Sequence, residues 1–327
     1  MIKFNSFLAQ DIEAFIRYRK NVGYTYDKYQ YYFTSFDRYV HEKESNLNDM
    51  TPSFFLEFRS SLSIEPEAIN QIFLVLRAFF DYLVRIERLS INPLTDISAL
   101  KSKTYVPYVF SPQQIESLLQ VVEKRIRSNS ETAFLRDLAV YSVISLMARC
   151  GLRISEPLRL KDKHYRKAEK TIYIEKTKFN KDRLLPLPES AVIVIDNYLS
   201  VRNSIIEQKK ISYLFTISKS QKIIKNHSIY RTFQKALKEL KIDPLRYQIG
   251  NINFGQPTPH SFRHSFAVNT LRVACKKGRN PESVLPVLAA YMGHTDYNNT
   301  MKYLKVFDSE HRKGWVDFCI FNKKDRK

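Results

Sequence analysis

The sequence predicts a mainly α-helical protein with one small β-sheet, divided into two domains. A chain of 327 residues is long for a single hydrophobic core, and its 44% hydrophobic content is enough for two. Apolar residues recur at helical spacing along most of the chain, and only one pair of short segments alternates like strands. We therefore expect a helical domain over residues 1–100, a linker over 101–107 and a second domain over 108–327.

Residues 7–89 are expected to form about four helices. Apolar residues from Phe7 to Ile16 mark the first helix, which Gly23 closes. Thr51 and Pro66 mark the starts of two later helices, because an N-cap threonine precedes Pro52 and proline is favoured at the first helical position. The tyrosines between positions 24 and 39 also recur with a helical period, which favours packing in a core over stacking on bases.

The second domain is expected to begin with a helix capped by Ser111 before Pro112. A long apolar helix follows over about 133–147. Residues 171–174 and 183–187 alternate like two strands of a hairpin, joined by a lysine-rich turn. Further helices are expected over residues 189–207, 228–240, 259–276, 281–292 and 297–304.

The formal charge of +20 lies entirely in the second part of the chain. Residues 1–105 carry 13 basic and 13 acidic side chains, whereas the remainder carries 40 basic and 20 acidic ones. A well-dispersed, merely solubilising charge would not be divided in this way. This distribution predicts that the second domain binds a polyanion, most commonly nucleic acid.

The cysteines and the apolar segments exclude several other classes of protein. Cys150, Cys275 and Cys319 are far apart and form no CxxC pair, so neither a disulfide framework nor a zinc ribbon is expected. The N-terminus lacks the apolar core of a signal peptide, and no segment has the length of a membrane span. We expect a soluble, cytoplasmic protein that does not bind a membrane.

Two arginines have positions that suit a phosphate during a phosphoryl transfer, although either one taken alone is more simply explained as a solvated surface charge. Such a reaction builds negative charge on the equatorial oxygens, and a guanidinium is always charged and can bind two oxygens at once. Arg153 follows Gly151 where an apolar helix breaks, before Ser155-Glu156 begins the next helix. Arg263 lies near the start of a helix, where free amides also favour a phosphate.

Two histidines are candidates beside these arginines. Thr258 can cap the helix and Pro259 suits its first position, so His260 lies in the first turn, three residues before Arg263. His260 and His264 have the spacing of a metal-binding pair. No glutamate accompanies them as in HExxH and no third ligand is evident, so we expect no metal and no cofactor. His294 follows a glycine expected to end the preceding helix as a left-handed cap.

These residues lie in motifs that together resemble the tyrosine recombinase (phage integrase) family. The motifs are Ala148-Arg-Cys-Gly-Leu-Arg153-Ile-Ser-Glu156, Lys178-Phe-Asn-Lys-Asp-Arg-Leu-Leu-Pro-Leu187, Thr258-Pro-His260-Ser-Phe-Arg263-His264, Tyr291-Met-Gly-His294 and Thr300-Met-Lys-Tyr303-Leu. Their order and the nine-residue step from His294 to Tyr303 match the family. The resemblance implies six catalytic residues: Arg153, Lys178, His260, Arg263, His294 and Tyr303.

The resemblance also implies a reaction and an architecture. Tyr303 would attack the scissile phosphate, giving a 3′-phosphotyrosine and a free 5′ hydroxyl without metal or ATP. The hydroxyl of a partner strand would reverse the step, through a Holliday junction in a tetramer of protomers on two double-stranded DNA recombination sites. Off DNA the protein could be a monomer. A helical core-binding domain and a mixed catalytic domain would close on DNA as a C-shaped clamp.

Two of the implied roles have alternatives. By resemblance, His260 assists proton transfer from the nucleophile or bonds the phosphate. The family carries a lysine in the turn of a β-hairpin, where it protonates the leaving 5′ oxygen. Counting back five residues from Arg183 gives Lys178, although Lys176 and Lys181 lie in the same stretch.

The interval of 31 residues from Arg263 to His294 is longer than expected for compact members of the family. In having this longer interval the chain resembles the integrases carried by transposons. Transposition is therefore an expected process in addition to integration. The nearest alternative function is that of a type IB topoisomerase, which uses the same chemistry but acts as a monomer and rejoins the strand that it cut. A DNA-binding regulator with an inactive site is the alternative from another class, which the six filled positions disfavour.

The segment that follows Tyr303 contains aromatic residues that a free tail would not carry. It has 24 residues and includes the run from Gly314 to Phe321, which contains Trp315. In related recombinases this segment often packs on the neighbouring protomer. We expect docking in trans rather than on the protomer's own core, because a large apolar patch usually marks an interaction surface.

Overall fold

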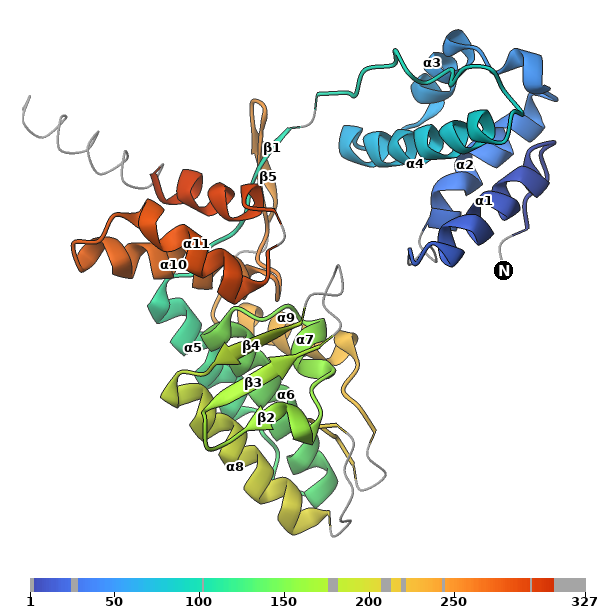
Figure 1. Cartoon of the computed structure of the whole chain (residues 1–327). Coiled ribbons are helices and arrows are strands. Elements are labelled where there is room, and N and C mark those ends of the chain that lie inside the picture. Colours follow the sequence, from blue (N-terminus) through green and yellow to red (C-terminus); the bar gives the residue numbers. More distant parts are fainter. Residues whose placement is uncertain are drawn as a thin grey trace, which may run out of the picture. The chain divides into compact units, whose positions relative to one another are not determined.

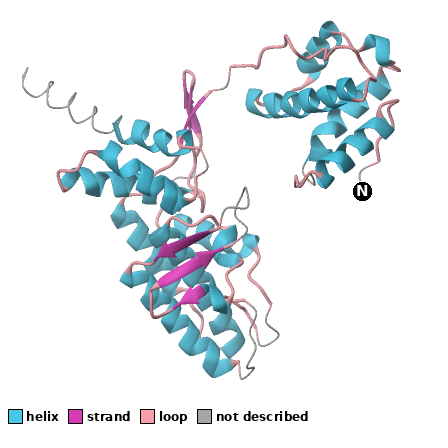
Figure 2. Ribbon diagram, in the orientation of Figure 1, coloured by secondary structure: helices cyan, strands magenta, loops and turns pink. Residues whose placement is uncertain are grey.

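The structure is a computed structural model that describes residues 3–24, 29–101, 103–175, 182–206, 213–218, 222–242, 245–294 and 296–308. The chain forms two compact units, Met1–Lys103 and Thr104–Lys327, which Figure 1 colours along the sequence. Helices predominate in both units (Figure 2). None of the helices in the described ranges is both long and apolar enough to span a membrane.

The first unit is a helical domain with an aromatic core. Its helices are α1 (Ala9–Asn21), α2 (Tyr29–Glu42), α3 (Pro52–Ser61) and α4 (Pro66–Arg85), with a 3-10 turn over Leu47–Asp49. The Thr51 hydroxyl accepts a hydrogen bond from the Phe54 amide at 3.3 Å, which confirms the predicted cap of α3. Phe36, Phe55 and Phe80 are fully buried where α2, α3 and α4 meet. Tyr32 and Tyr39 pack against this core, as their spacing predicted, whereas Tyr31 is exposed.

The second unit is built around one buried helix, α6. The helices of this unit are α5 (Pro112–Lys124), α6 (Glu131–Cys150), α7 (Ser155–Leu158), α8 (Glu189–Ile205), α9 (Asn226–Glu239), α10 (Ser261–Lys276) and α11 (Pro281–Met292). Residues 298–308 are also helical. Helix α6 is packed by α5, α8, α9 and α10, which explains why most of its residues from Ala139 to Cys150 are buried. Ser111 caps α5 in a reciprocal capping box with Gln114.

Two three-stranded sheets complete the second unit. Strands β2 (Tyr165–Arg166), β3 (Thr171–Ile174) and β4 (Arg183–Pro186) form an antiparallel sheet whose β3–β4 pair is the predicted hairpin. In the other sheet, β6 (Ile252–Phe254) pairs in parallel with β1 (Thr104–Val106) and antiparallel with β5 (Tyr247–Ile249). This second sheet was not predicted. Its strands have three residues each, and the β1–β6 pairing joins segments almost 150 residues apart.

The helices that follow residue 260 share a small core of their own. It contains Leu271 of α10, Leu285 and Leu288 of α11, and Tyr303 and Phe307 of the last helical segment. Helix α10 also packs against α9 through the contact between the Phe233 and Phe262 rings, whose centroids are 5.5 Å apart. These contacts fix the start of α10, the end of α11 and the segment that carries Tyr303 relative to one another.

Candidate active site

Arg153 is placed by the left-handed end of α6. The helix stops at Gly151, whose φ of 61° is open to glycine but strained for other residues. A Cβ at this position would also lie 2.6 Å from a ring carbon of Phe266. Arg153 then precedes the short helix α7, and its backbone amide donates to Glu156 Oε2 at 2.9 Å. The predicted break and restart of the helix around Arg153 is confirmed.

His260 and Arg263 lie at the start of α10, though the helix begins differently from the prediction. We expected the Thr258 side chain to cap it, with Pro259 at the first position. Instead, a turn over residues 258–260 precedes α10, and the Thr258 amide donates to the Ser261 hydroxyl at 3.0 Å. His260 is the N-cap residue with helical dihedrals. The N-cap of α10 therefore has no side-chain hydrogen bond, and the Ser261 hydroxyl instead accepts from an amide that precedes the helix.

The guanidinium groups of Arg153 and Arg263 converge on the C-terminal end of α11. Arg263 is 1% exposed and donates to the Gly151 carbonyl at 2.8 Å and to the Met292 carbonyl at 2.6 Å. Arg153 donates to the same Met292 carbonyl at 3.4 Å and to the Gly293 carbonyl at 3.2 Å. The last carbonyls of a helix lack helical partners and carry partial negative charge, so they hold the two cations side by side.

A buried carboxylate, Glu156, connects Arg153 to the β-hairpin. Glu156 is 7% exposed and accepts from the Arg153 guanidinium at 2.9 Å. It also accepts two hydrogen bonds from Arg183, at 3.0 and 3.1 Å. Burial by itself would raise the pKa of Glu156, but the hydrogen bonds and charge of Arg183 hold it below its ordinary value. Arg183 reaches α11 as well, through an Nε hydrogen bond of 3.0 Å to the Tyr291 carbonyl.

His294 is fixed in the turn after α11. Gly293 ends α11 with a φ of 66°, which confirms the predicted left-handed cap. A Cβ on Gly293 would lie 2.9 Å from the Arg183 guanidinium, so glycine also permits this close approach. His294 Nδ1 lies 2.8 Å from the hydroxyl of Thr300, which is fully buried. This hydrogen bond orients the imidazole toward the last helical segment.

Tyr303 is buried beside two of the histidines. It is 5% exposed, and its hydroxyl lies 3.1 Å from His264 Nδ1. The His294 ring stacks on the Tyr303 ring with centroids 6.1 Å apart. His264 is in edge-to-face contact with His260, with centroids 4.7 Å apart. The structure thus brings Arg153, Arg263, His260, His294 and Tyr303 into one site.

The site lowers the pKa of its bases and raises that of its tyrosine. Burial first, and then repulsion from neighbouring cations, lowers the pKa of His264 to about 3 and that of His294 to about 4. The same causes lower the pKa of His260, although solvent at its exposed edge weakens them. Burial raises the pKa of Tyr303, and the charges of Arg263 and Arg153 counter this only in part. The resting site therefore holds neutral histidines and a protonated tyrosine.

Lys178 lies outside the described residues, as do Lys176 and Lys181. The end of the hairpin turn is nevertheless located by Arg183, the first residue of β4. Because Arg183 bonds to Glu156 and to the end of α11, the strand that follows the turn begins inside the site. The assignment of Lys178 as the general acid therefore stays a prediction.

Three residues of the site were not assigned a role from the sequence. The sequence pattern predicts only a helix start at Glu156, only a strand start at Arg183 and only half of a metal-binding pair at His264. The spacing of four residues does place His264 beside His260 on α10, and this signal could have included it. Nothing local indicated that Glu156 and Arg183 form a pair.

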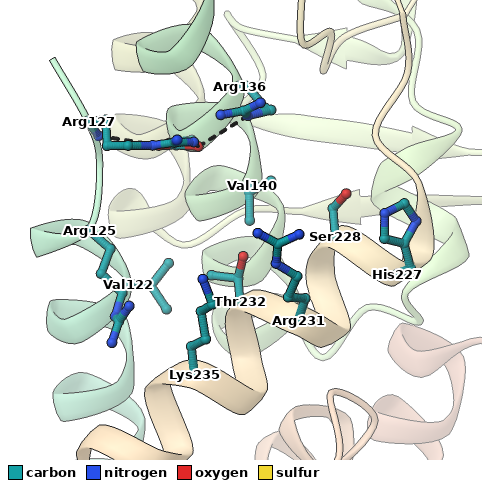
Figure 3. A pocket seen from close by; sticks show the side chains of 11 residues that line it. Val122, Arg125, Arg127, Arg136, Val140, His227, Ser228, Arg231, Thr232 and Lys235 are labelled. Atoms are coloured by element: carbon teal, nitrogen blue, oxygen red, sulfur yellow. Dashed lines mark hydrogen bonds and ion pairs between the residues drawn. The ribbon is translucent and has the colours of Figure 1, made fainter. Parts of the chain in front are cut away.

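A basic cavity of about 610 Å³ lies between α5, α6 and α9 (Figure 3). The basic residues lining it are Arg125, Arg127, Arg136, His227, Arg231 and Lys235. Arg127 is paired with Asp137 at 2.7 and 2.9 Å, and Arg125 with Glu239 at 2.6 Å. Within the described ranges, neither Arg231 nor Lys235 forms an ion pair, so the cavity keeps an excess of positive charge.

This cavity is separate from the site around Tyr303. It lies near the N-terminal end of α6, at Arg136, whereas Arg153 follows the C-terminal end of the same helix. At a rise of about 1.5 Å per residue, the two sites are roughly 20 Å apart along α6. The cavity lies in the second unit, where the sequence predicted that a polyanion binds.

Comparisons with known proteins show the family to which the chain belongs. The chain matches the phage integrase family over residues 109–310, a range that includes every candidate residue. A tyrosine recombinase of Thermosipho africanus is 25% identical over 308 residues, covering 91% of this chain and 96% of that protein.

Two solved structures share the fold. A λ integrase dimer bound to a COC′ core site has a TM-score of 0.62 at 15% identity, covering 89% of this chain and 96% of that one. The integrase of the transposon Tn1549, in complex with a circular intermediate DNA, has a TM-score of 0.61 at 16% identity, covering 90% and 94%. Because the family match spans more than half of the chain, this protein belongs to the phage integrase family and is a tyrosine-type site-specific recombinase that acts on DNA.

Proposed function

We propose that Tyr303 cuts DNA by attacking the scissile phosphate, forming a 3′-phosphotyrosyl bond and releasing a 5′ hydroxyl. The observation that carries this proposal is the enclosure of the Tyr303 hydroxyl in a site that contains two converging arginines and three histidines. A phenol with a raised pKa needs both a proton acceptor and positive charge near the phosphate before it can attack.

Arg153 and Arg263 supply that charge. Their guanidinium groups both donate to the Met292 carbonyl and therefore lie side by side, so one phosphate bound next to them would contact both arginines. Burial and repulsion from Arg153 lower the pKa of Arg263 to about 10, which leaves it protonated at neutral pH. Replacing either arginine by alanine should slow cleavage by about 100-fold or more, as for the loss of an oxyanion donor. DNA binding should fall far less, because many other basic residues remain.

The remaining roles follow from the family resemblance. His260 and His294 would donate hydrogen bonds to the phosphate, and Lys178 would protonate the leaving 5′ oxygen. Replacing that bridging oxygen by sulfur makes a leaving group that needs no proton. The Lys178→Ala variant should then be largely rescued, whereas Arg263→Ala should not. Rescue of Lys176→Ala instead would move the acid by two residues.

The substrate and the assembly are the wider part of the proposal. The protein would bind double-stranded recombination sites in the cytoplasm, with the basic cavity of Figure 3 contacting the DNA backbone. Protomers would pair on one site and form a tetramer on two, and the λ integrase structure above is likewise a dimer on its core site. The segment 309–327, which lies outside the described residues, would dock on the neighbouring protomer. Its deletion should leave half-site binding intact but abolish cooperative pairing and recombination.

A nicked suicide duplex that carries the recombination site tests the nucleophile. DNA from the genomic flanks of the gene supplies candidate sites. The wild-type protein should accumulate a covalent adduct that withstands denaturant, with or without a metal chelator. Tyr303→Phe should bind DNA but give no adduct, while Tyr297→Phe, which changes an exposed tyrosine six residues earlier, should react normally. An adduct formed by Tyr303→Phe, or its loss on chelation, would refute the proposal.

A further inference from the structure

We infer that His264 takes the proton from Tyr303 when the tyrosine attacks the phosphate, an inference that rests on Tyr303 being the nucleophile. His264 Nδ1 lies 3.1 Å from the Tyr303 hydroxyl oxygen, within the range of a direct proton transfer. The tyrosine is buried in a small core, so packing fixes its side of this contact.

The other two histidines are less well placed for this transfer. His294 Nδ1 is occupied by the Thr300 hydroxyl at 2.8 Å, and its ring lies against the face of Tyr303 with an interplanar angle of 22°. Among the described residues, His260 makes no hydrogen bond to Tyr303, and its ring instead contacts His264. The family resemblance gave His260 a part in proton transfer, whereas the geometry favours its neighbour one helical turn later.

The direction of the hydrogen bond depends on the tautomer of His264. When neutral His264 carries its proton on Nε2, Nδ1 accepts from the hydroxyl of the protonated Tyr303, and this is the tautomer that can take the proton. The groups that face His264 are His260 and Arg263 of α10, His294 after α11 and the Tyr303 hydroxyl itself. Burial and the charge of Arg263 disfavour an imidazolium at His264, and protonation of His260 or His294 would add to that repulsion.

Arrival of the scissile phosphate would change this balance. Its negative charge, bound by Arg153 and Arg263, offsets the repulsion that adds to burial in lowering the pKa of His264. His264 therefore becomes a better proton acceptor only when DNA occupies the site. This would keep the nucleophile protonated in the free enzyme and prepare it for reaction on the substrate.

The chemical step is balanced within the site. The Tyr303 O–H bond breaks, its proton moves to His264 Nδ1, and the phenolic oxygen forms a bond to phosphorus. The bond from phosphorus to the 5′ oxygen breaks, and that oxygen takes a proton from the general acid. In the rejoining step the general acid, now deprotonated, takes the proton of an attacking 5′ hydroxyl, and the 5′ oxygen forms a bond to phosphorus. The bond from phosphorus to the Tyr303 oxygen breaks, and His264 returns the proton to that oxygen.

Two substitutions separate proton transfer from simple positioning. His264→Asn keeps an amide oxygen near the place of Nδ1, so it can accept the hydrogen bond but cannot take the proton. His264→Ala removes both functions. Single-turnover cleavage of the nicked duplex by the full-length protein is measured from pH 5.5 to 9, together with DNA binding and thermal unfolding. His264→Gln serves as a second variant if the asparagine protein is unfolded.

Proton acceptance by His264 predicts that both His264→Asn and His264→Ala slow cleavage by about 100-fold or more, while DNA affinity is kept. The residual rate should rise about tenfold per pH unit, because hydroxide must then remove the proton. Added imidazole should partly restore His264→Ala. As a comparison, His260→Asn should be slower than wild type but keep the wild-type shape of the pH profile.

Cleavage by His264→Asn at close to the wild-type rate would overturn the inference, because a hydrogen-bond acceptor would then be sufficient. A flat pH profile in a slow, folded variant would overturn it as well. Failure of the proposed nucleophile is a separate result, since Tyr303→Phe would then still form the adduct.

Discussion

Glu156 is expected to hold the arginines of the site together, and Glu156→Gln tests this with little change in shape. The side chain is 7% exposed and is paired with Arg183, which is 10% exposed. Removing one partner of a buried ion pair costs about 3–5 kcal/mol, because the other charge stays buried without compensation. Glutamine retains one oxygen that can accept from Arg183, and Arg183 keeps its bond to the Tyr291 carbonyl. We therefore expect the lower end of the range, about 3 kcal/mol.

Urea and thermal unfolding of the second unit provide the measurement. At about 2–4 °C per kcal/mol for a domain of this size, Tm should fall by roughly 10 °C. A double-mutant cycle isolates the pair: in the Arg183→Met background, Glu156→Gln should cost about 2 kcal/mol less than in the wild type, because no buried charge is stranded. As a control, Glu169→Gln breaks the exposed pair with Arg166 and should cost no more than about 0.5 kcal/mol.

Additive costs in the double-mutant cycle, or a loss below about 1 kcal/mol, would refute this account of Glu156. The variant should also cleave DNA more slowly than the wild type, since Arg153 loses its acceptor at 2.9 Å. Stability lost without any effect on cleavage would mean that Glu156 supports the fold alone.

The basic cavity, one glycine and the buried histidines yield further predictions. Arg231→Ala and Lys235→Ala should each lower the slope of log affinity against log salt by about 1, and an unchanged slope would exclude a phosphate contact. Gly151→Ala should destabilise the second unit by about 2 kcal/mol in urea unfolding, because φ is 61° and an aromatic ring occupies the space that a Cβ would need. A variant as stable as the wild type would contradict this explanation. His264 and His294 have folded pKa values below the ordinary value of about 6.5, so their contribution to stability is complete above that pH and is lost as the pH falls toward about 3 and 4. Lowering the pH from 7 to 5 should reduce the free energy of unfolding in urea by up to about 2 kcal/mol for each histidine, and His264→Asn should make this reduction smaller. Equal free energies of unfolding at pH 7 and pH 5 would contradict the burial of neutral histidines.

The sequence alone determined the features that depend on short separations. Helical spacing placed His260 and Arg263 together at the start of one helix, and a glycine before His294 predicted the left-handed turn that the structure contains. The cap at Ser111 and the hairpin of β3 and β4 were likewise readable, because capping and strand alternation involve neighbouring residues. The family resemblance of the motifs then indicated the recombinase before any contact was known.

Tertiary structure decided the contacts that join distant segments. The Glu156–Arg183 pair, the shared Met292 carbonyl and the parallel pairing of β1 with β6 link residues between 27 and almost 150 positions apart. No periodicity encodes such contacts, because they depend on how helices pack rather than on local conformation. The hydrogen bond between Tyr303 and His264 is of the same kind: its two residues lie 39 positions apart, and only the packing of the last helical segment against α10 brings the two side chains together.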